Sequence, residues 1–438
     1  MTVAYLLPNR KHILPDTAPD EQEIRKFLLD LFNKAIAAAD PANCVPQHLP
    51  KPPTGDTLLI ATGKAAASMA QAAERAWPKN TNLSGVALTR YGHTTPCECI
   101  DVIEASHPVP DDRGHKAAKD LLMKANQLGE NDLLLFLVSG GGSSLLTLPA
   151  EGITLDDKKA INHALLMSGA PIGEMNCVRK HLSAIKGGRL AEAAYPAKVV
   201  TLAISDVPGD NPSTIASGPT VADPTTISDM VEIVQKKYAL APPSCDIKSI
   251  LKQASETLKE GDRALMNNRF TLIATPSTMM QAVATHVRAA GHKIIDLGAN
   301  IEGEARQVAV DHASLASRSD GPVLILSGGE TTVTVNQETK PGKGGRNAEY
   351  LLALAISLDG AADIHAIAAD TDGIDGSEDN AGAIITPDTL SRAKAIGLDP
   401  QSMLDNHDAY SFFEALGDLV ITGPTLTNVN DFRAIWMS

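Results

Sequence analysis

Residues 133–144 read Leu-Leu-Leu-Phe-Leu-Val-Ser-Gly-Gly-Gly-Ser-Ser, so an unbroken apolar run passes directly into a loop of small residues. Six apolar residues followed by a turn signal are typical of a strand that is buried on both faces. The glycines allow a tight turn into a following helix. We therefore expect residues 133–138 to form a buried strand and residues 139–144 to form a loop at its carboxyl end.

The same arrangement recurs before and after this segment. Residues 57–61 (TLLIA) predict a buried strand that leads into Thr62-Gly63-Lys64 and an alanine-rich helix ending near Ala76. Residues 199–204 (VVTLAI) predict a third strand, which leads into Ser205-Asp206. Strands that alternate with helices in this way predict an α/β fold, here a Rossmann-like parallel sheet in an α/β/α sandwich.

A second domain is expected after residue 243. The stretch Ala241-Pro242-Pro243-Ser244 interrupts the alternation, and we place the boundary there. This divides the chain into an N-terminal domain of residues 1–243 and a C-terminal α/β domain of residues 244–438. The predicted strands of the second domain span residues 270–274, 323–326, 331–335 and 364–368, and its predicted helices span residues 247–260 and 347–357.

The composition excludes several classes of protein. The 438-residue chain has a formal net charge of −14 and only 3% aromatic residues, which argues against binding of nucleic acid and attraction to an anionic membrane. Five irregularly spaced cysteines predict free thiols, with Cys177 buried in a helix. The N-terminus lacks a signal-peptide pattern, and the longest apolar run is too short to span a membrane. We expect a cytoplasmic protein; its oligomeric state stays open, with a homodimer as one option.

Small and charged residues follow the predicted strands, at the edge of the sheet where ligands bind in open α/β folds. The loop Ser139, Gly140, Gly141, Gly142, Ser143 and Ser144 can expose several amide groups, which suits a phosphate or carboxylate. An ordinary tight turn explains the same glycines. The chain contains no G-x-x-x-x-G-K-[ST] motif and no G-x-G-x-x-G after a strand, so a conventional P-loop and a Rossmann dehydrogenase are disfavoured.

Carboxylates at two strand ends are candidates for catalysis or metal binding. Asp206 lies where a carboxylate can orient a hydroxyl group for attack. Asp370 and Asp372 follow a predicted strand and can hold a hydrated Mg²⁺, although Asx turns explain them equally well. Calcium sensing is rejected, because the twelfth position counted from Asp370 is Ala381 rather than glutamate.

Two basic segments can present cations to an anionic substrate. Residues 176–190 carry Arg179, Lys180 and Lys186 on what we expect to be a helix ending at two glycines, and a solvated helix face is the alternative. Arg346 starts a predicted helix after two glycines and can clamp a carboxylate or phosphate through its planar fork. His107, on a loop, is more typical of a structural histidine.

Six segments together resemble the class II glycerate kinase family, and they occur in that family's order. They are residues 139–144, 176–190, 205–210 with 215–219, 327–330, 344–349 and 370–376, which extend over nearly the whole chain and into the C-terminal domain known as MOFRL. The resemblance implies a two-domain α/β enzyme with a smaller, mixed-sheet C-terminal domain and an active site in the interdomain cleft. It also implies transfer of a phosphoryl group from ATP, with Mg²⁺, to D-glycerate, giving 2-phosphoglycerate.

The family's catalytic residues correspond to Lys64, Asp206 and Arg346. From chemistry and position we add Glu330, together with the glycine loop and the basic segment, as residues that bind phosphate or substrate. Two other functions remain open at this point. Some family members have been labelled hydroxypyruvate reductases, and a non-catalytic sensor of sugar acids would use the same fold.

Overall fold

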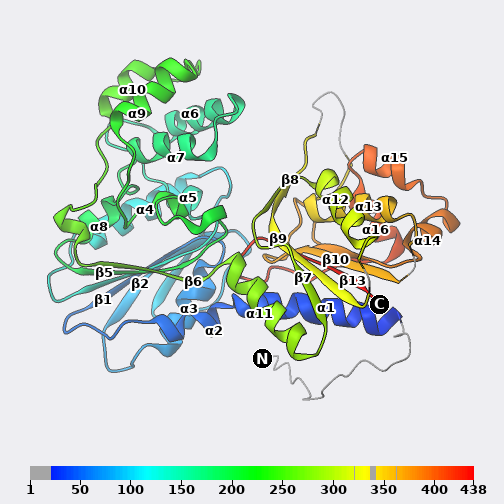
Figure 1. Ribbon diagram of the computed structural model, residues 1–438. Helices are drawn as coiled ribbons and strands as arrows, with labels where there is room; N and C mark the ends of the chain where they lie inside the picture. Colours follow the sequence, from blue (N-terminus) through cyan, green and yellow to red (C-terminus); the bar gives the residue numbers. More distant parts are fainter. Residues whose placement is uncertain (1–20, 320, 336–341, 362) are drawn as a thin grey trace. The chain divides into compact units, whose positions relative to one another are not determined.

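The computed structural model describes residues 21–319, 321–335, 342–361 and 363–438, which divide into two compact units (Figure 1). The N-terminal unit comprises residues 36–279 and 424–430. The C-terminal unit comprises the described residues within 1–35, 280–423 and 431–438. The predicted boundary after residue 243 differs from this division, because residues 268–274 form a strand that pairs with the sheet of the N-terminal unit.

The N-terminal unit is built on a six-stranded parallel sheet with the order β3-β2-β1-β4-β5-β6. Its strands are β1 (Thr57–Thr62), β2 (Leu83–Arg90), β3 (Ile100–Ala105), β4 (Leu133–Val138), β5 (Lys198–Ile204) and β6 (Asn268–Ala274). All residues of β1 and β4 are buried, as their unbroken apolar runs predict. The chain builds outward from β1 to β3 and then returns to place β4 on the other side of β1. The carboxyl ends of β1 and β4 therefore define the topological switch point, where ligands bind in such sheets.

Helices cover both faces of this sheet (Figure 1). They include α2 (Pro41–Cys44), α3 (Ala66–Ala76), α4 (Asp112–Ala125), α5 (Gly142–Leu145) and α8 (Arg189–Ala194). An apolar cluster joins Ile60 and Phe136 of the sheet to Leu121 of α4 and Leu190 of α8, all of them buried. The predicted Rossmann-like α/β/α sandwich is confirmed.

A helical layer stands apart from the sheet in the same unit. It consists of α6 (Leu155–Met167), α7 (Ile172–His181), α9 (Ile227–Val231), a π-helical turn (Glu232–Lys237) and α10 (Ile247–Gln253). These helices share an apolar cluster of their own, which includes Leu165, Val178 and Met230. The side chain of Thr154 caps α6, because it accepts a hydrogen bond from the amide of Asp157.

Two helices predicted in this region are shorter than expected. The helix expected over residues 176–190 ends at His181, because the Ser183 hydroxyl accepts hydrogen bonds from the amides of Ile185 and Lys186 and turns the chain. The helix expected over residues 247–260 ends at Gln253.

The C-terminal unit contains a mixed sheet with the order β12-β11-β10-β13-β9-β7, with β8 also paired to β9. Its strands are β7 (Lys293–Asp296), β8 (Ile301–Glu304), β9 (Val323–Thr332), β10 (Ile364–Asp370), β11 (Gly382–Ile385), β12 (Leu419–Val420) and β13 (Asp431–Met437). The two strands predicted at residues 323–326 and 331–335 are wrong as separate elements. Residues 323–332 form the single strand β9, because β13 pairs with residues 323–329 and β8 pairs with residues 329–332, and residues 333–335 lie beyond its end.

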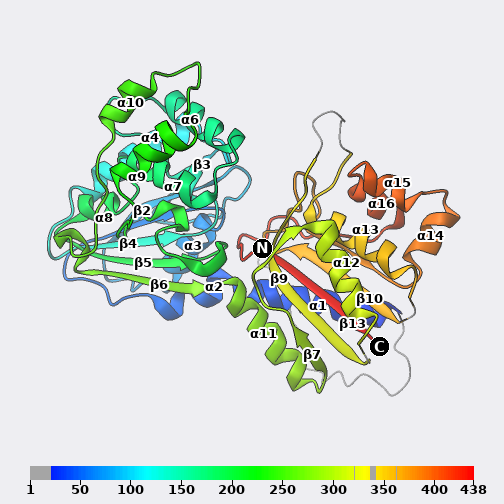
Figure 2. The ribbon, with the colours of Figure 1, turned by 45° about the horizontal axis from the view of Figure 1, so that its top comes forward.

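Helices lie on both faces of this second sheet as well (Figure 2). They are α1 (Glu21–Ala38), α11 (Pro276–Ala289), α12 (Ala305–Ala316), α13 (Arg346–Leu358), α14 (Thr389–Ala395), α15 (Pro400–Asp405) and α16 (Ala409–Leu416). Phe32 of α1 stacks on Phe432 of β13 with 6.0 Å between ring centroids. The helix predicted over residues 347–357 is confirmed as α13.

Candidate active site

Two backbone contacts join the loops that follow β1 and β4. The amide of Lys64 donates to the carbonyl of Gly140 at 2.8 Å, and the amide of Ala65 donates to the Ser139 hydroxyl at 3.0 Å. A Cβ atom on Gly63 would lie 2.2 Å from that hydroxyl, so only glycine fits there. The backbone of Lys64 is therefore fixed at the switch point by the neighbouring strand.

The glycine loop makes room for three functional side chains. A Cβ atom on Gly140 would lie 1.8 Å from the Oδ2 atom of Asp206. A Cβ atom on Gly141 would lie 3.0 Å from the His107 ring and 3.4 Å from Cγ of Lys64. Gly141 also has φ +81°, which disfavours any residue with a side chain. The glycines thus let Lys64, His107 and Asp206 converge on one loop, so the His107 ring lies beside the two predicted catalytic residues.

Asp206 is held by residues that the sequence analysis missed. The Asn428 side chain donates to Oδ2 of Asp206 at 2.8 Å, and the Asn430 side chain donates to the backbone carbonyl of Asp206 at 2.7 Å. These asparagines lie in the segment 424–430, which returns to the N-terminal unit. The only sequence signal was the polar stretch Thr427-Asn428-Val429-Asn430 before an apolar run.

The remainder of the loop is held by two segments outside the sheet, the turn at Ile215–Ser217 and the stretch between α7 and α8. The hydroxyl groups of Ser143 and Ser217 lie 2.5 Å apart, and the Lys186 ammonium donates to the carbonyl of Ser143 at 2.7 Å. The amides of Gly142, Ser144 and Leu145 donate within the loop, so the predicted anion nest depends on the other amides of residues 139–144.

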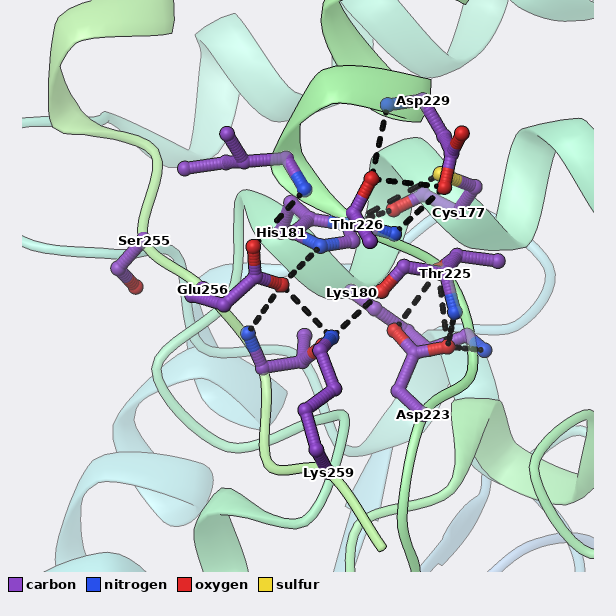
Figure 3. A network of polar contacts seen from close by, with 12 residues as sticks. Cys177, Lys180, His181, Asp223, Thr225, Thr226, Asp229, Ser255, Glu256 and Lys259 are labelled. Atoms are coloured by element: carbon purple, nitrogen blue, oxygen red, sulfur yellow. Dashed lines mark hydrogen bonds and ion pairs between the residues drawn. The ribbon is translucent and has the colours of Figure 1, made fainter.

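The three predicted cations of the basic segment have different environments. Lys180 is buried and pairs with the fully buried Asp223 at 2.8 Å, within the polar network that joins His181, Glu256 and Lys259 (Figure 3). Its ammonium group is thus directed at a carboxylate of its own chain. Arg179 instead contacts amide oxygens, and Lys186 contacts carbonyl oxygens.

Arg346, in the C-terminal unit, is surrounded by carboxylates. It begins α13 and contacts Glu330 at 2.7 Å, Asp370 at 2.8 Å and the fully buried Asp431 at 2.9 Å. Despite partial burial, the pKa of Arg346 is raised above its ordinary value by the charges of Asp431, Asp370 and Glu330. Glu330 reaches this cluster from within β9, where the sequence analysis had expected a loop.

Two further acids near Arg346 were missed. Asp431 opens β13 and also accepts from Asn347 and Arg433, and Asp375 accepts from the amides of Asn347 and Ala348. Burial raises the pKa of Asp375 to about 6. Asp375 lay in the D-x-D-G-x-D run, but its role at the start of α13 depends on a contact between distant segments.

The predicted metal ligands are already engaged. One oxygen of Asp370 pairs with Arg346, and the other accepts from the amide of Asp372. In the described part of the chain, no group of three or more His, Cys, Asp or Glu side chains is arranged to hold a metal ion. A Mg²⁺ ion is commonly held by one or two carboxylates and the phosphates of a nucleotide, so these two residues stay predicted ligands of that kind.

Other expectations concern the cysteines and the membrane. All five cysteines are free thiols, and Cys177 is buried in α7, as predicted. No helix within the described ranges has the length and apolar character needed to cross a bilayer. The segment considered for a signal peptide, residues 1–20, lies outside the described residues.

A doubly wound parallel sheet with charged residues at its switch point, joined to a mixed-sheet unit, defines a two-domain α/β enzyme class. A family model described as a domain of unknown function (DUF4147) matches residues 27–252, and the MOFRL family model matches residues 323–431.

The chain is 39% identical to the D-glycerate 2-kinase of Thermotoga maritima, over 94% of this chain and 98% of the relative. It is 51% identical to a putative hydroxypyruvate reductase of Agrobacterium vitis, over 94% of both chains. The crystal structure of Thermotoga maritima glycerate kinase matches with a TM-score of 0.86 and 38% identity, over 95% of this chain and 100% of that chain. The chain belongs to the class II glycerate kinase family.

The environment of Lys180 leads to a test of stability. Lys180→Met leaves the Asp223 carboxylate buried without its cation, and removal of one partner of a buried pair typically costs about 3–5 kcal/mol. We expect the free energy of unfolding to fall by this order in chemical denaturation. The control is Lys237→Met, whose partner Glu174 lies nearer the surface and whose loss should change the free energy of unfolding little. Equal, small effects of both variants would contradict a structural role for Lys180.

Proposed function

We propose that this protein is an ATP-dependent D-glycerate 2-kinase that forms 2-phosphoglycerate and ADP. The observation that carries the proposal is the convergence of Lys64, the glycine loop and Asp206 at the switch point of a sheet that belongs to the glycerate kinase family. Phosphoryl transfer requires positioning and stabilisation of charge, and a cation, amide donors and a carboxylate supply both.

Each residue at the switch point has a distinct role in this proposal. The Lys64 ammonium stabilises the charge that develops on the transferred phosphoryl group. Asp206 accepts the proton of the C2 hydroxyl of glycerate, or orients that hydroxyl for attack on phosphorus. The contact between Asn428 and Asp206 holds the carboxylate in place. The glycine loop offers amides and hydroxyls to anionic oxygens.

Arg346 is proposed to bind the glycerate carboxylate or the transferred group. Its three carboxylate partners hold the guanidinium in one orientation, and Glu330 is the most exposed of them. An incoming anion would replace this most exposed contact at the smallest cost, because an exposed carboxylate regains its hydration. Glu330 then acts as a placeholder for substrate.

Mg²⁺ is proposed to enter with ATP as the nucleotide complex. When bound, the ion neutralises charge on the β- and γ-phosphates. Asp370 and Asp372, which adjoin one another at the end of β10, are the residues proposed to hold it.

Hydroxypyruvate reduction is the second candidate, because the name of the Agrobacterium vitis relative carries it. A reductase requires a nicotinamide site. The turn after β1 reads Thr-Gly-Lys rather than the G-x-G-x-x-G that dinucleotide-binding sheets place there. The lysine at that turn instead suits transfer of a phosphoryl group.

One pair of assays separates the candidate functions. The purified chain is incubated with D-glycerate, ATP and Mg²⁺, and the product is identified by phosphorus NMR. It is also incubated with hydroxypyruvate and NADH or NADPH, and absorbance at the nicotinamide band is followed. We expect 2-phosphoglycerate and no oxidation of the nicotinamide. Oxidation without ADP release would establish the reductase, and neither reaction would favour a sensor of sugar acids.

Replacement of Lys64 tests the proposed chemistry. Lys64→Met removes a charge that acts mainly in the transition state, so kcat and kcat/KM should fall together by about 10²–10³, with binding of ATP and glycerate nearly intact. Steady-state kinetics and a melting curve give the result. A variant of normal stability with near-normal kcat would exclude this role.

Replacement of Arg346 tests substrate binding. Arg346→Lys keeps the positive charge but loses the planar fork, so a carboxylate clamp predicts a raised KM for glycerate with a smaller change in kcat. The melting temperature should also fall, because the buried Asp431 loses a two-oxygen contact. Kinetics are measured well below that temperature, so that only folded enzyme is counted. A lowered melting temperature with an unchanged KM would make Arg346 purely structural.

A further inference from the structure

Three buried or half-buried cations in the N-terminal unit contact no carboxylate among the residues that the structure describes. They are Lys158 of α6, Arg179 of α7 and Lys186, and we call them the cationic cluster. Lys158 is more than nine-tenths buried, and its ammonium has no hydrogen-bond partner among the described residues. Buried charges in proteins are normally paired, so this cluster requires an explanation.

A chain of hydrogen bonds connects the cluster to the glycine loop. Arg179 donates to Asn162 at 2.7 Å and to Asn176 at 3.3 Å, and Asn162 lies one turn beyond Lys158 on α6. The Asn176 oxygen accepts from the Ser217 hydroxyl, which in turn contacts the Ser143 hydroxyl. Lys186 donates to the carbonyl of Ser143. The network therefore runs from the helical layer to the loop after β4.

The charges in this region repel one another. Burial, followed by the charges of Arg179 and Arg189, lowers the pKa of Lys158 to about 7. Burial, followed by the charges of Lys158 and Arg179, lowers the pKa of Lys186 well below its ordinary value. Nearby Lys180 contrasts with both, because it pairs with Asp223. The charges of the cationic cluster therefore have no carboxylate partner in the described part of the chain, although Lys180, the residue after Arg179, has one.

We propose that the cationic cluster is a binding site for the phosphate groups of the nucleotide, with Lys158 as a previously unassigned ligand of these groups. The proposal rests on the proposed kinase function. Three adjacent cations match the several charges of a polyphosphate, whereas the single charge of a glycerate carboxylate would leave most of the repulsion in place. The hydroxyls of Ser143 and Ser217 supply further polar contacts at the same place.

Access to the cluster comes from its half-buried members. Ser143, Asn162 and Arg179 retain partial exposure, while Lys158 and Lys186 are buried. A phosphate that contacts Arg179 and the loop can then approach the two lysines without unfolding of the unit. Binding would pair the charges, raise the pKa of Lys158 and draw a proton from solvent.

The decisive variant is Lys158→Met, which keeps an unbranched side chain one heavy atom shorter and removes its charge. We expect the melting temperature to rise, because an unpaired buried charge is replaced by an apolar group. We expect the Kd for ADP, measured by calorimetry, to increase by about 30-fold or more, as for other buried charge pairs. The matched control is Lys159→Met, at the next position of α6, where the side chain is partly exposed and lies 3.6 Å from Asp156. Lys159→Met should change neither the melting temperature nor the Kd for ADP.

Proton uptake gives a signature that a structural role would not produce. Near pH 7.5 Lys158 is partly neutral before ADP binds and becomes charged afterwards. The measured binding enthalpy of the unaltered enzyme should therefore depend on the ionisation enthalpy of the buffer. In Lys158→Met this dependence should decrease, and in Lys159→Met it should stay. A second variant, Arg179→Gln, should also raise the Kd for ADP. It tests the proposal if Lys158→Met does not fold.

The outcomes distinguish this proposal from the proposed function. Unchanged ADP binding with a raised KM for glycerate would assign the cluster to the substrate carboxylate and overturn the proposal. Unchanged values for both ligands would leave the cluster structural and overturn it as well. Weakened ADP binding in a chain whose unaltered form transfers no phosphate to glycerate would support the nucleotide site while the proposed function fails.

Discussion

The junction between the ends of β1 and β4 is the constraint on which the N-terminal unit depends. The strand order of the parallel sheet reverses between β1 and β4, so the loops at the carboxyl ends of these two strands lie side by side where such sheets bind ligands. The hydrogen bonds of Lys64 and Ala65 with the loop at residues 139–144 hold the two loops together. Because Gly63, Gly140 and Gly141 have no side chains, the backbones approach closely and Asp206 and His107 reach the same place. The close packing of these loops therefore fixes the positions of the charged side chains around them.

The two units differ in whether their buried cations have carboxylate partners. In the C-terminal unit, Arg346 is paired with three carboxylates, and its charge is stabilised in the absence of any ligand. In the N-terminal unit, the cationic cluster has no such partners among the described residues, and burial drives its lysines toward neutrality. A cation that is already paired with carboxylates favours exchange of one anion for another. Cations without carboxylate partners are stabilised most by binding of a multiply charged anion.

The errors of the sequence analysis share a physical origin. Residues 327–330 have the composition of a turn, yet they continue β9 because β13 pairs with residues 327–329 and β8 pairs with residues 329–332. The basic segment was expected to form one helix, but α7 ends at His181, and Ser183 beyond it forms a bridge with Pro149 and donates its hydroxyl to the carbonyl of Leu148. Residues 270–274 follow a proline-rich break, yet their strand joins the first sheet beside β5. In each case a contact with a distant segment outweighed the local preference.

The sequence by itself determined the α/β class, the buried strands at residues 57–61 and 133–138, and the glycine loop, because burial on both faces and tight turns require particular residues in consecutive positions. It also placed Lys64, Asp206 and Arg346 at the ends of elements. Only the tertiary structure decided which charges are compensated: that Lys180 has a carboxylate, that Arg346 has three, and that Lys158 has none among the described residues. The energy of a charge depends on its neighbours in space, and these come from segments far apart along the chain.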